Sequence, residues 1–149
     1  MSEHHATIAW QRTSPDFKYM TYNRAHDWRF TEVTVAASAA KDYRGEPERV
    51  NPEEAFVASL SSCHMLTLLA VAAKQKLVPE SYDDEAVGVL EKNADGRLAI
   101  TRVTLRPRIV WAPGVTVSDE QLAKLHHDAH EHCFIANSVT TVVTVEPQT

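Results

Sequence analysis

The feature that most constrains the fold is a long apolar run in the middle of the chain, SLSSCHMLTLLAVAAKQ at residues 59–75. Residues 51–54, which precede the run by four positions, read Asn-Pro-Glu-Glu. They supply a helix cap, a proline suited to the first turn and two carboxylates at the positive end of the dipole. We therefore predict a helix over residues 52–76 that ends before Pro79.

Apolar residues fall on nearly every face of this predicted helix, so it needs cover on most of its sides. The run also contains several polar side chains, which favour a buried helix over a membrane span. A chain of 149 residues rarely builds so large a core around one helix. We therefore expect a homodimer with a hydrophobic interface above roughly 2,000 Å² in total, and no membrane partner.

The remaining patterns predict short strands and one further helix. A helix is expected from Asp119 to about Cys133, capped by Ser118, and Asn93–Gly96 has the composition of a hairpin turn. This order of elements predicts an α+β fold in a single domain, residues 1–149. Strands are expected at residues 5–10, 18–22, 28–37, 85–91, 98–111 and 139–145.

Composition and charge exclude some functions and narrow the location. The net charge of −5 and the isoelectric point near 5.9 argue against nucleic acid as a partner, which requires a basic face. The first residues show no basic segment followed by an apolar core, so no signal peptide is visible and we expect a cytoplasmic protein. In that compartment a cysteine pair is more typical of catalysis or redox chemistry than of a structural disulfide.

The chain has two cysteines, one inside the long helix and one at the end of the second. Free cysteine is often a buried packing residue, but each of these stands beside histidine, so a reactive thiol is equally tenable. Glu53 precedes Cys63 by ten residues, about 15 Å of helix. Its carboxylate can therefore act on Cys63 only through another group, such as an arginine from another segment or chain.

A cluster of histidines crowds the second helix next to Cys133. His126 and His130 are four residues apart and share a face, as metal ligands on a helix do. The glutamate of a zinc-protease motif is absent from this pair. The alternative is that the histidines of residues 126–132 are solvated or lie at the helix end, where the dipole favours a cation. We expect no bound metal and no cofactor.

Two segments together resemble the OsmC/Ohr family of thiol-dependent peroxidases. NPEEAFVASLSSCHMLTLLA at residues 51–70 is similar to the first-cysteine helix of that family, and HEHCFIANSVTTVVTV at residues 130–145 is similar to its second-cysteine segment. The resemblance extends from about Tyr22 to Val145. It implies the OsmC-like fold, with β-sheets around two long central helices in an intertwined homodimer.

The resemblance also implies roles for individual residues. Cys63 would be the peroxidatic cysteine, Cys133 the resolving cysteine and Glu53 the active-site glutamate. The family's arginine would be Arg24 in YNRAHDWRF (residues 22–30), with Arg29 as second choice. The chain departs from the family in its arginine loop, which is not glycine-rich, in His64 where an aromatic residue is common, and in CFIAN after Cys133.

The implied activity is reduction of organic hydroperoxides to alcohols. A permanently charged arginine would stabilise the reactive thiolate. Cys63 would become a sulfenic acid, Cys133 would resolve it as a disulfide, and an external dithiol, such as a lipoyl protein, would reduce the pair. Two alternatives stay open: an OsmC-fold stress-associated or binding protein with weak peroxidase activity, and a His/Cys metal-binding sensor.

Overall fold

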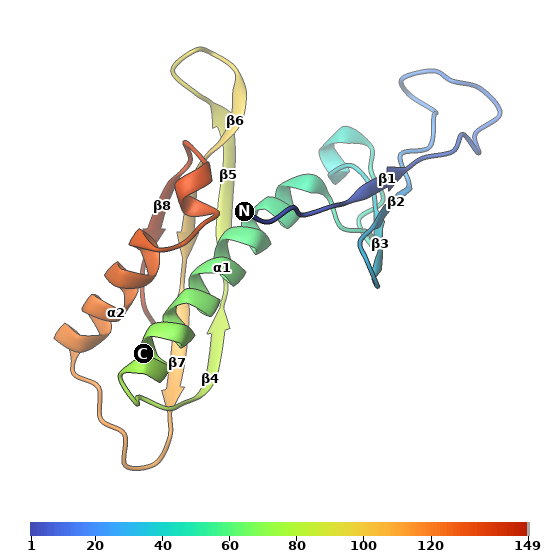
Figure 1. Cartoon of the computed structure of the whole chain (residues 1–149). Helices are drawn as coiled ribbons and strands as arrows, with labels where there is room; N and C mark the ends of the chain where they lie inside the picture. The colour runs from blue at the N-terminus through green and yellow to red at the C-terminus, as the bar shows by residue number, and fades with distance from the viewer. Residues whose placement is uncertain (149) are drawn as a thin grey trace. The chain divides into compact units, whose positions relative to one another are not determined.

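The computed structural model describes residues 1–148 and consists of two compact units, residues 1–55 and the remainder from Phe56 on. We call them the N-terminal and C-terminal units. Figure 1 shows that each contains its own β-structure, and that the helices α1 and α2 belong largely to the C-terminal unit. The predicted α+β class is confirmed. The single domain stays a prediction.

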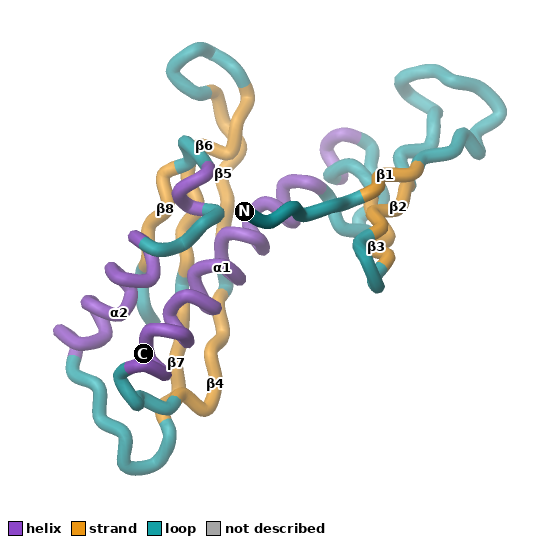
Figure 2. The backbone as a smooth tube through the Cα atoms, in the orientation of Figure 1, coloured by secondary structure: helices purple, strands orange, loops and turns teal. Residues whose placement is uncertain are grey.

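The N-terminal unit is built on a three-stranded antiparallel sheet with strand order β1-β2-β3. The predicted strand at 18–22 is wrong, because the backbone N–H groups of Thr21 and Tyr22 donate to the Lys18 carbonyl and form a turn within a long loop (Figure 2). The predicted strand at 28–37 is instead a hairpin, closed by Phe30 N–H donating to the Val33 carbonyl at 2.8 Å. The strands are β1 (Thr7–Ala9), β2 (His26–Arg29) and β3 (Thr34–Ala37).

The segment after β3 requires a glycine. The chain passes through the short 3-10 helix η1 (Lys41–Tyr43) and returns, so that Gly45 N–H donates to the Ala40 carbonyl at 3.1 Å. A Cβ atom at Gly45 would stand 1.5 Å from the Ala39 carbonyl oxygen. The backbone fixes the position of Cβ, so no rotamer can relieve its clash with a carbonyl oxygen, and only glycine permits this close return.

Helix α1 spans Pro52–Lys74 and begins as the sequence predicts. The Glu54 backbone N–H donates to Asn51 Oδ1 at 2.8 Å, and the Asn51 N–H donates to Glu54 Oε2 at 3.2 Å. This reciprocal pair is a capping box built on asparagine. The helix ends two residues before the predicted Lys76, which has the left-handed φ of 60° that often follows a helix.

Only one stripe of α1 is buried within the chain. Its buried residues are four apart (Leu60, His64, Leu68 and Ala72), whereas Leu66 on another face is 60% exposed. By length and composition alone α1 could cross a membrane, with a mean hydropathy of 1.8. A core helix meets the same test, and burial of a histidine in its stripe fits a core helix better. In either environment, another apolar surface must cover the faces of α1 that this chain leaves exposed.

The C-terminal unit contains two sheets. In one, with order β5-β6-β8, β5 is antiparallel and β8 parallel to β6; in the other, β4 and β7 are antiparallel. The predicted strand at 98–111 is interrupted at Arg106, whose N–H donates to Asp84 Oδ1 at 2.6 Å, and Pro107 follows. The strands are β4 (Pro79–Asp84), β5 (Val87–Lys92), β6 (Leu98–Leu105), β7 (Pro107–Trp111) and β8 (Val142–Val145).

Helix α2 spans Asp119–Glu131 and lies beside α1 (Figure 1). Ser118 caps it as predicted, in a capping box with Gln121. Leu68 and Ala72 of α1 and Leu125 and Ala129 of α2 form one buried cluster, onto which residues of β4 and β7 pack. A second cluster joins α1 to β6 through Leu60, Val103 and Leu105. The packing of α1 against α2 brings Cys63 close to Cys133 and His64 close to His126.

Candidate functional site

The two cysteines, 70 positions apart in the sequence, meet in the C-terminal unit. Cys63 lies on α1 and is half-buried, and Cys133 follows the end of α2 and is 1% exposed. Both are free thiols, and the Cys63 side chain is within hydrogen-bonding reach of Cys133. The contact forms because the packing of α1 on α2 places the end of α2 near the middle of α1, where Cys63 lies.

The surroundings of Cys133 keep it protonated. Burial is the main cause that raises the pKa of its thiol, and the hydrogen bond with Cys63 raises it further. The Ala136 backbone N–H, which donates to Cys133 Sγ at 3.5 Å, acts in the opposite direction. Because a thiolate is the reactive form, Cys133 is poorly suited to attack first and is suited to react with a group formed on its neighbour.

A buried pair of imidazoles also lies in the contact between α1 and α2. His64 directly follows Cys63 in α1, and His126 lies in α2, seven residues before Cys133. His64 Nε2 of α1 and His126 Nδ1 of α2 are 3.0 Å apart, and the two rings deviate from parallel by only 6°. The ring centroids are 5.3 Å apart, longer than the nitrogen separation by about two ring radii. The rings therefore lie edge to edge in nearly one plane, sharing one hydrogen, rather than face to face.

Burial keeps both imidazoles neutral. His64 is 1% and His126 5% exposed. Burial lowers the pKa of His64 to about 4, and the closeness of His126 and His130 lowers it further, because protonation of more than one of these rings would bring like charges together. Burial also lowers the pKa of His126, against the opposing charge of Asp84. The expectation that the α2 histidines are mainly surface or helix-end residues is wrong for His126.

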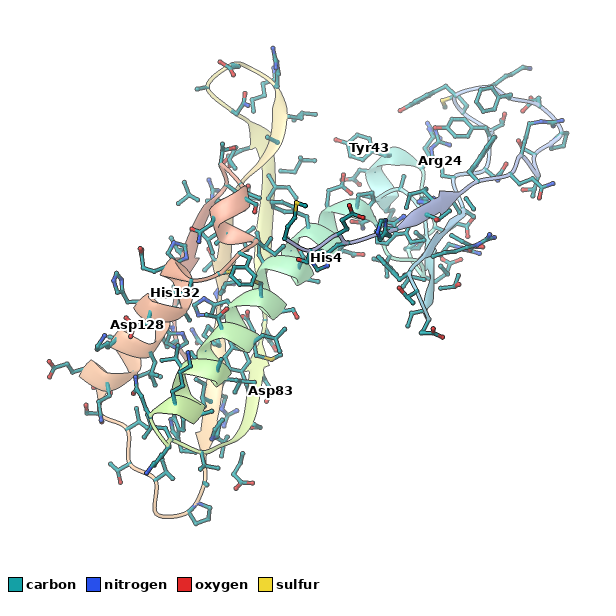
Figure 3. The ribbon with its side chains drawn as sticks, in the orientation of Figure 1. His4, Arg24, Tyr43, Asp83, Asp128 and His132 are labelled. Carbon is teal, nitrogen blue, oxygen red and sulfur yellow. The ribbon has the colours of Figure 1, made fainter. Side chains whose placement is uncertain are left out.

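The other α2 histidines differ from this pair. His127 and His132 are exposed, and His132 Nδ1 lies 2.8 Å from the Asp128 carbonyl oxygen at the end of α2 (His132 and Asp128 are labelled in Figure 3). His130 is half-buried. Among residues 1–148, no group of three or more His, Cys, Asp or Glu side chains is placed to hold a metal ion. The hydrogen bond between His64 and His126 occupies one nitrogen of each ring, so each ring has only one nitrogen left that could bind a metal.

Arg24 lies in the N-terminal unit (Figure 3) and is 9% exposed. Its guanidinium donates to the carbonyls of Tyr22 at 2.9 Å and Tyr19 at 2.7 Å. Its Cζ atom stands over the Tyr22 ring at 3.9 Å and the Tyr19 ring at 5.2 Å. Arg29 is instead an exposed residue paired with Asp27 at 3.9 Å. Of the two candidate arginines, Arg24 is the one that the fold holds in place.

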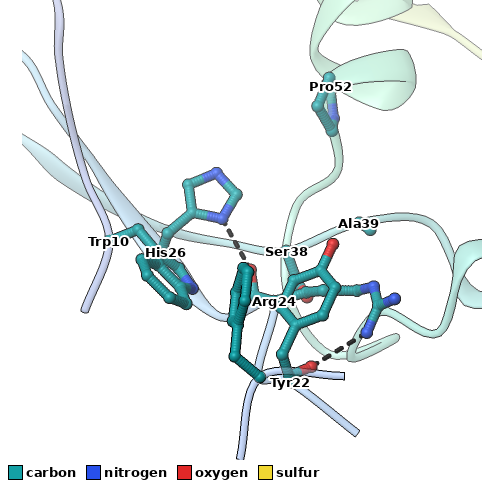
Figure 4. A pocket seen from close by; sticks show the side chains of 8 residues that line it. Trp10, Tyr22, Arg24, His26, Ser38, Ala39 and Pro52 are labelled. Atoms are coloured by element: carbon teal, nitrogen blue, oxygen red, sulfur yellow. Dashed lines mark hydrogen bonds between the residues drawn. The ribbon is translucent and has the colours of Figure 1, made fainter. Parts of the chain in front are cut away.

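Arg24 forms part of the wall of an apolar pocket of about 420 Å³ in the same unit (Figure 4). The lining is mostly aromatic or small, and the guanidinium is its one cationic side chain. Such a combination suits a ligand with an apolar body and a polar or anionic end. The lining residues are Trp10, Phe17, Tyr22, Arg24, His26, Ser38, Ala39 and Pro52.

Glu53 stands in the first turn of α1, next to Pro52 of the pocket wall. Its Oε2 atom is buried and has no hydrogen-bond partner within residues 1–148. Over the same residues Arg24 forms no ion pair, so the predicted contact between Arg24 and Glu53 is not made in this chain alone. A buried carboxylate oxygen left unpaired is costly, which indicates that a partner group completes it.

Sequence reasoning missed the aromatic residues around Arg24 and the partner of His64. Tyr19 and Tyr22 stand five and two residues before Arg24 in the sequence, and aromatic residues so close to one arginine could have indicated a cation–π arrangement. No local pattern could have linked His64 to His126, because that contact depends on how α1 packs on α2.

Comparison with known proteins agrees with this architecture. The family model described as OsmC-like protein matches residues 44–148. A solved structure of an OsmC-like protein of unknown function from Vibrio cholerae is 47% identical, with 99% of this chain and 100% of that chain covered and a TM-score of 0.96. The uncharacterized protein YmaD of Bacillus subtilis is 26% identical over 108 residues, 72% of this chain and 71% of that protein.

A further solved structure extends the likeness of fold. It is a Legionella pneumophila protein described as the organic hydroperoxide resistance protein OsmC, which is 18% identical, with 100% of this chain and 98% of that chain covered and a TM-score of 0.76. At this identity the likeness concerns the fold alone. The match of the family model over most of the sequence, including both cysteine segments, shows that this chain belongs to the OsmC-like family.

Proposed function

We propose that the protein is a thiol-dependent peroxidase that reduces organic hydroperoxides to alcohols. The Cys63 thiolate attacks the distal peroxide oxygen, the O–O bond breaks, and the departing alkoxide takes a proton to become the alcohol. Cys63 is left as a sulfenic acid. Cys133 then attacks the sulfenic sulfur, a disulfide forms, and the hydroxide leaves as water after taking a proton.

The observation that carries this proposal is the contact between Cys63 and Cys133 across α1 and the end of α2. Their environments suit different roles, since Cys63 is half-buried and reachable whereas the buried Cys133 has a raised pKa. Two cysteines that served only to pack the core or to form a structural disulfide would not require such a difference in exposure and pKa. The proposal assigns the first reaction to Cys63 and resolution to Cys133.

Arg24 and Glu53 complete the proposed site. Arg24 would stabilise the Cys63 thiolate, and Glu53 would orient the guanidinium through a bidentate contact. The buried, unpaired Glu53 Oε2 and the absence of a carboxylate partner for Arg24 within residues 1–148 support a pairing that forms when a second copy binds. The apolar pocket beside Arg24 supports a hydroperoxide with a hydrophobic body.

We further propose a homodimer in the cytoplasm, reduced by an external dithiol. The apolar faces of α1 that this chain leaves uncovered support the dimer. The disulfide formed in each turnover needs two electrons from a dithiol, for which a lipoyl protein is a candidate, and a reducing compartment would maintain that supply.

The second candidate is an OsmC-fold binding protein with weak peroxidase activity. It is favoured by His64, which sits beside Cys63 and turns its ring into the α1–α2 contact rather than toward a substrate. A metal-binding sensor is less favoured, since the two buried imidazoles bond to each other.

Peroxide consumption by the purified protein tests the proposal. With an organic hydroperoxide and a dithiol, the wild type should turn over many times and Cys63→Ser should lose activity. Without reductant, Cys133→Ser should consume one equivalent per chain. Ser62→Ala, a change at an exposed neighbour of Cys63 on the same helix, is the matched control. Full activity of Cys63→Ser would refute the proposal, and turnover barely above the protein-free rate in the wild type would favour the binding protein.

A further inference from the structure

A chain of side-chain hydrogen bonds begins on β2 and ends at the backbone of Arg24. Trp28 Nε1 donates to His26 Nε2 at 2.9 Å, and His26 Nδ1 lies 2.8 Å from the Arg24 carbonyl oxygen (Figure 4). An indole nitrogen can only donate and a carbonyl oxygen can only accept. His26 must therefore be neutral, with its hydrogen on Nδ1, and it holds the Arg24 peptide at a fixed distance from the sheet.

The side chain of Arg24 is held separately. Two of its five N–H groups donate to the carbonyls of Tyr22 and Tyr19, and its planar face lies over the Tyr22 ring at 3.9 Å. The Tyr19 ring is more distant, at 5.2 Å, and is mostly exposed. Tyr22 also lines the pocket, so its ring is the wall against which the guanidinium rests. The other three N–H groups of the guanidinium have no hydrogen-bond partner within residues 1–148.

We propose that His26 and Tyr22 are positioning residues for Arg24: His26 fixes its backbone and Tyr22 orients its guanidinium. This rests on the proposed function, in which Arg24 stabilises the Cys63 thiolate. Neither residue touches the reacting atoms. His26 and Tyr22 both restrict the orientation of Arg24 before the substrate binds. A charge that is already oriented stabilises an anion without the cost of reorganisation.

The chemical test is the pH profile of Cys63 alkylation in the full chain. Arg24→Ala should slow alkylation near neutral pH and move the profile to higher pH. Tyr22→Leu should do the same in part, by about two- to thirty-fold, the range that a cation–π contact spans. Tyr22→Phe, which keeps the ring, should restore the profile. His26→Leu should move it, and His26→Asn, which can still donate to the Arg24 carbonyl, should restore it. Tyr43→Leu, outside the pocket lining, is the control.

Double variants distinguish positioning from a general structural role. If Tyr22 acts only through Arg24, Tyr22→Leu combined with Arg24→Ala should match Arg24→Ala alone. Additive losses would overturn the proposal, as would a wild-type profile in both Tyr22→Leu and His26→Leu while Arg24→Ala is shifted.

A second readout separates this proposal from the proposed function. ¹⁵N relaxation of the Arg24 Nε–H group measures its ordering without any chemistry at Cys63. The group should be ordered in the wild type and in Tyr22→Phe, and mobile in Tyr22→Leu and His26→Leu. Equal ordering in all four overturns the positioning roles. An unshifted alkylation profile in Arg24→Ala refutes the role of Arg24 in the proposed function instead, whatever the relaxation shows.

Discussion

Acidification to about pH 5 is expected to destabilise the folded protein through the buried His64. The unfolded chain binds a proton at this residue with a pKa of 6.5, whereas burial lowers the folded pKa to about 4. Between these values the unfolded state holds more protons than the folded state, so stability falls as pH falls. The contribution is fully present above about pH 6.5 and is lost progressively below it.

The size of the loss follows from the width of that window. Each pH unit inside it costs about 1.4 kcal/mol, so moving from pH 6.5 to pH 5 costs about 2 kcal/mol at this one residue. His64 is 1% exposed, so solvent screens the effect little. The pKa of His126 is lowered by burial too and contributes in the same direction, although the charge of Asp84 opposes it.

Urea unfolding at about pH 7.5 and about pH 5 measures this loss. One protein concentration is used throughout, because formation of the proposed dimer would make stability depend on concentration. The quantity to compare is the change in unfolding free energy between the two pH values, since other groups titrate in every variant. This change should be about 2 kcal/mol smaller in His64→Leu than in the wild type. His127→Leu, at the exposed neighbour of His126, should behave as the wild type.

An equal loss in His64→Leu and the wild type would refute the reasoning. The His64→Leu variant leaves His126 without its buried partner. If this variant does not fold, NMR titration of the His64 ring in the wild type takes the place of the unfolding experiment. NMR should then give a pKa near 4, and a value near the ordinary one of about 6.5 would contradict the account.

Three further predictions concern assembly, metal and backbone. Leu66→Lys should weaken the proposed dimer, seen as a monomer by sedimentation at micromolar concentration, because Leu66 is 60% exposed in the single chain; an unchanged dimer would mean that this face is not the interface. Protein purified without a histidine tag should contain less than one equivalent of zinc or iron, and a full equivalent lost in His126→Ala or His130→Ala would favour the sensor. Gly45→Ala should destabilise the fold by about 1–3 kcal/mol in urea unfolding, because its Cβ would meet the Ala39 carbonyl oxygen; unchanged stability would contradict that clash.

Local signals predicted the helices well and the strands less well. Asn51 and Ser118 cap α1 and α2 as the sequence indicates, since capping depends on neighbouring residues alone. The turn between β2 and β3 has no glycine, proline or asparagine, so the hairpin was read as one strand. Strand β4, with the polar sequence PESYDD, is missing from the predicted strands, because its sequence lacks a strand pattern and only its pairing with β7 makes it one.

In the candidate site, too, features set by neighbouring residues could be predicted and features set by packing could not. The roles of Cys63 and Cys133 stay predictions, and they rest on the family resemblance of the residues around each cysteine. The pairing of His64 with His126 could not, since it depends on the packing of α1 against α2. The aromatic surroundings of Arg24 lie within one loop, but the sequence does not say which rings face the guanidinium.

The most direct test of the central claim, that Cys63 and Cys133 form a peroxide-reducing pair, is the intact mass of the protein after one equivalent of an organic hydroperoxide without reductant. We predict that the wild type loses two hydrogens and yields a peptide in which Cys63 is linked to Cys133. Cys133→Ser should instead gain one oxygen on Cys63. An unchanged wild-type mass, or an oxygen found on Cys133 while Cys63 stays reduced, would contradict the account.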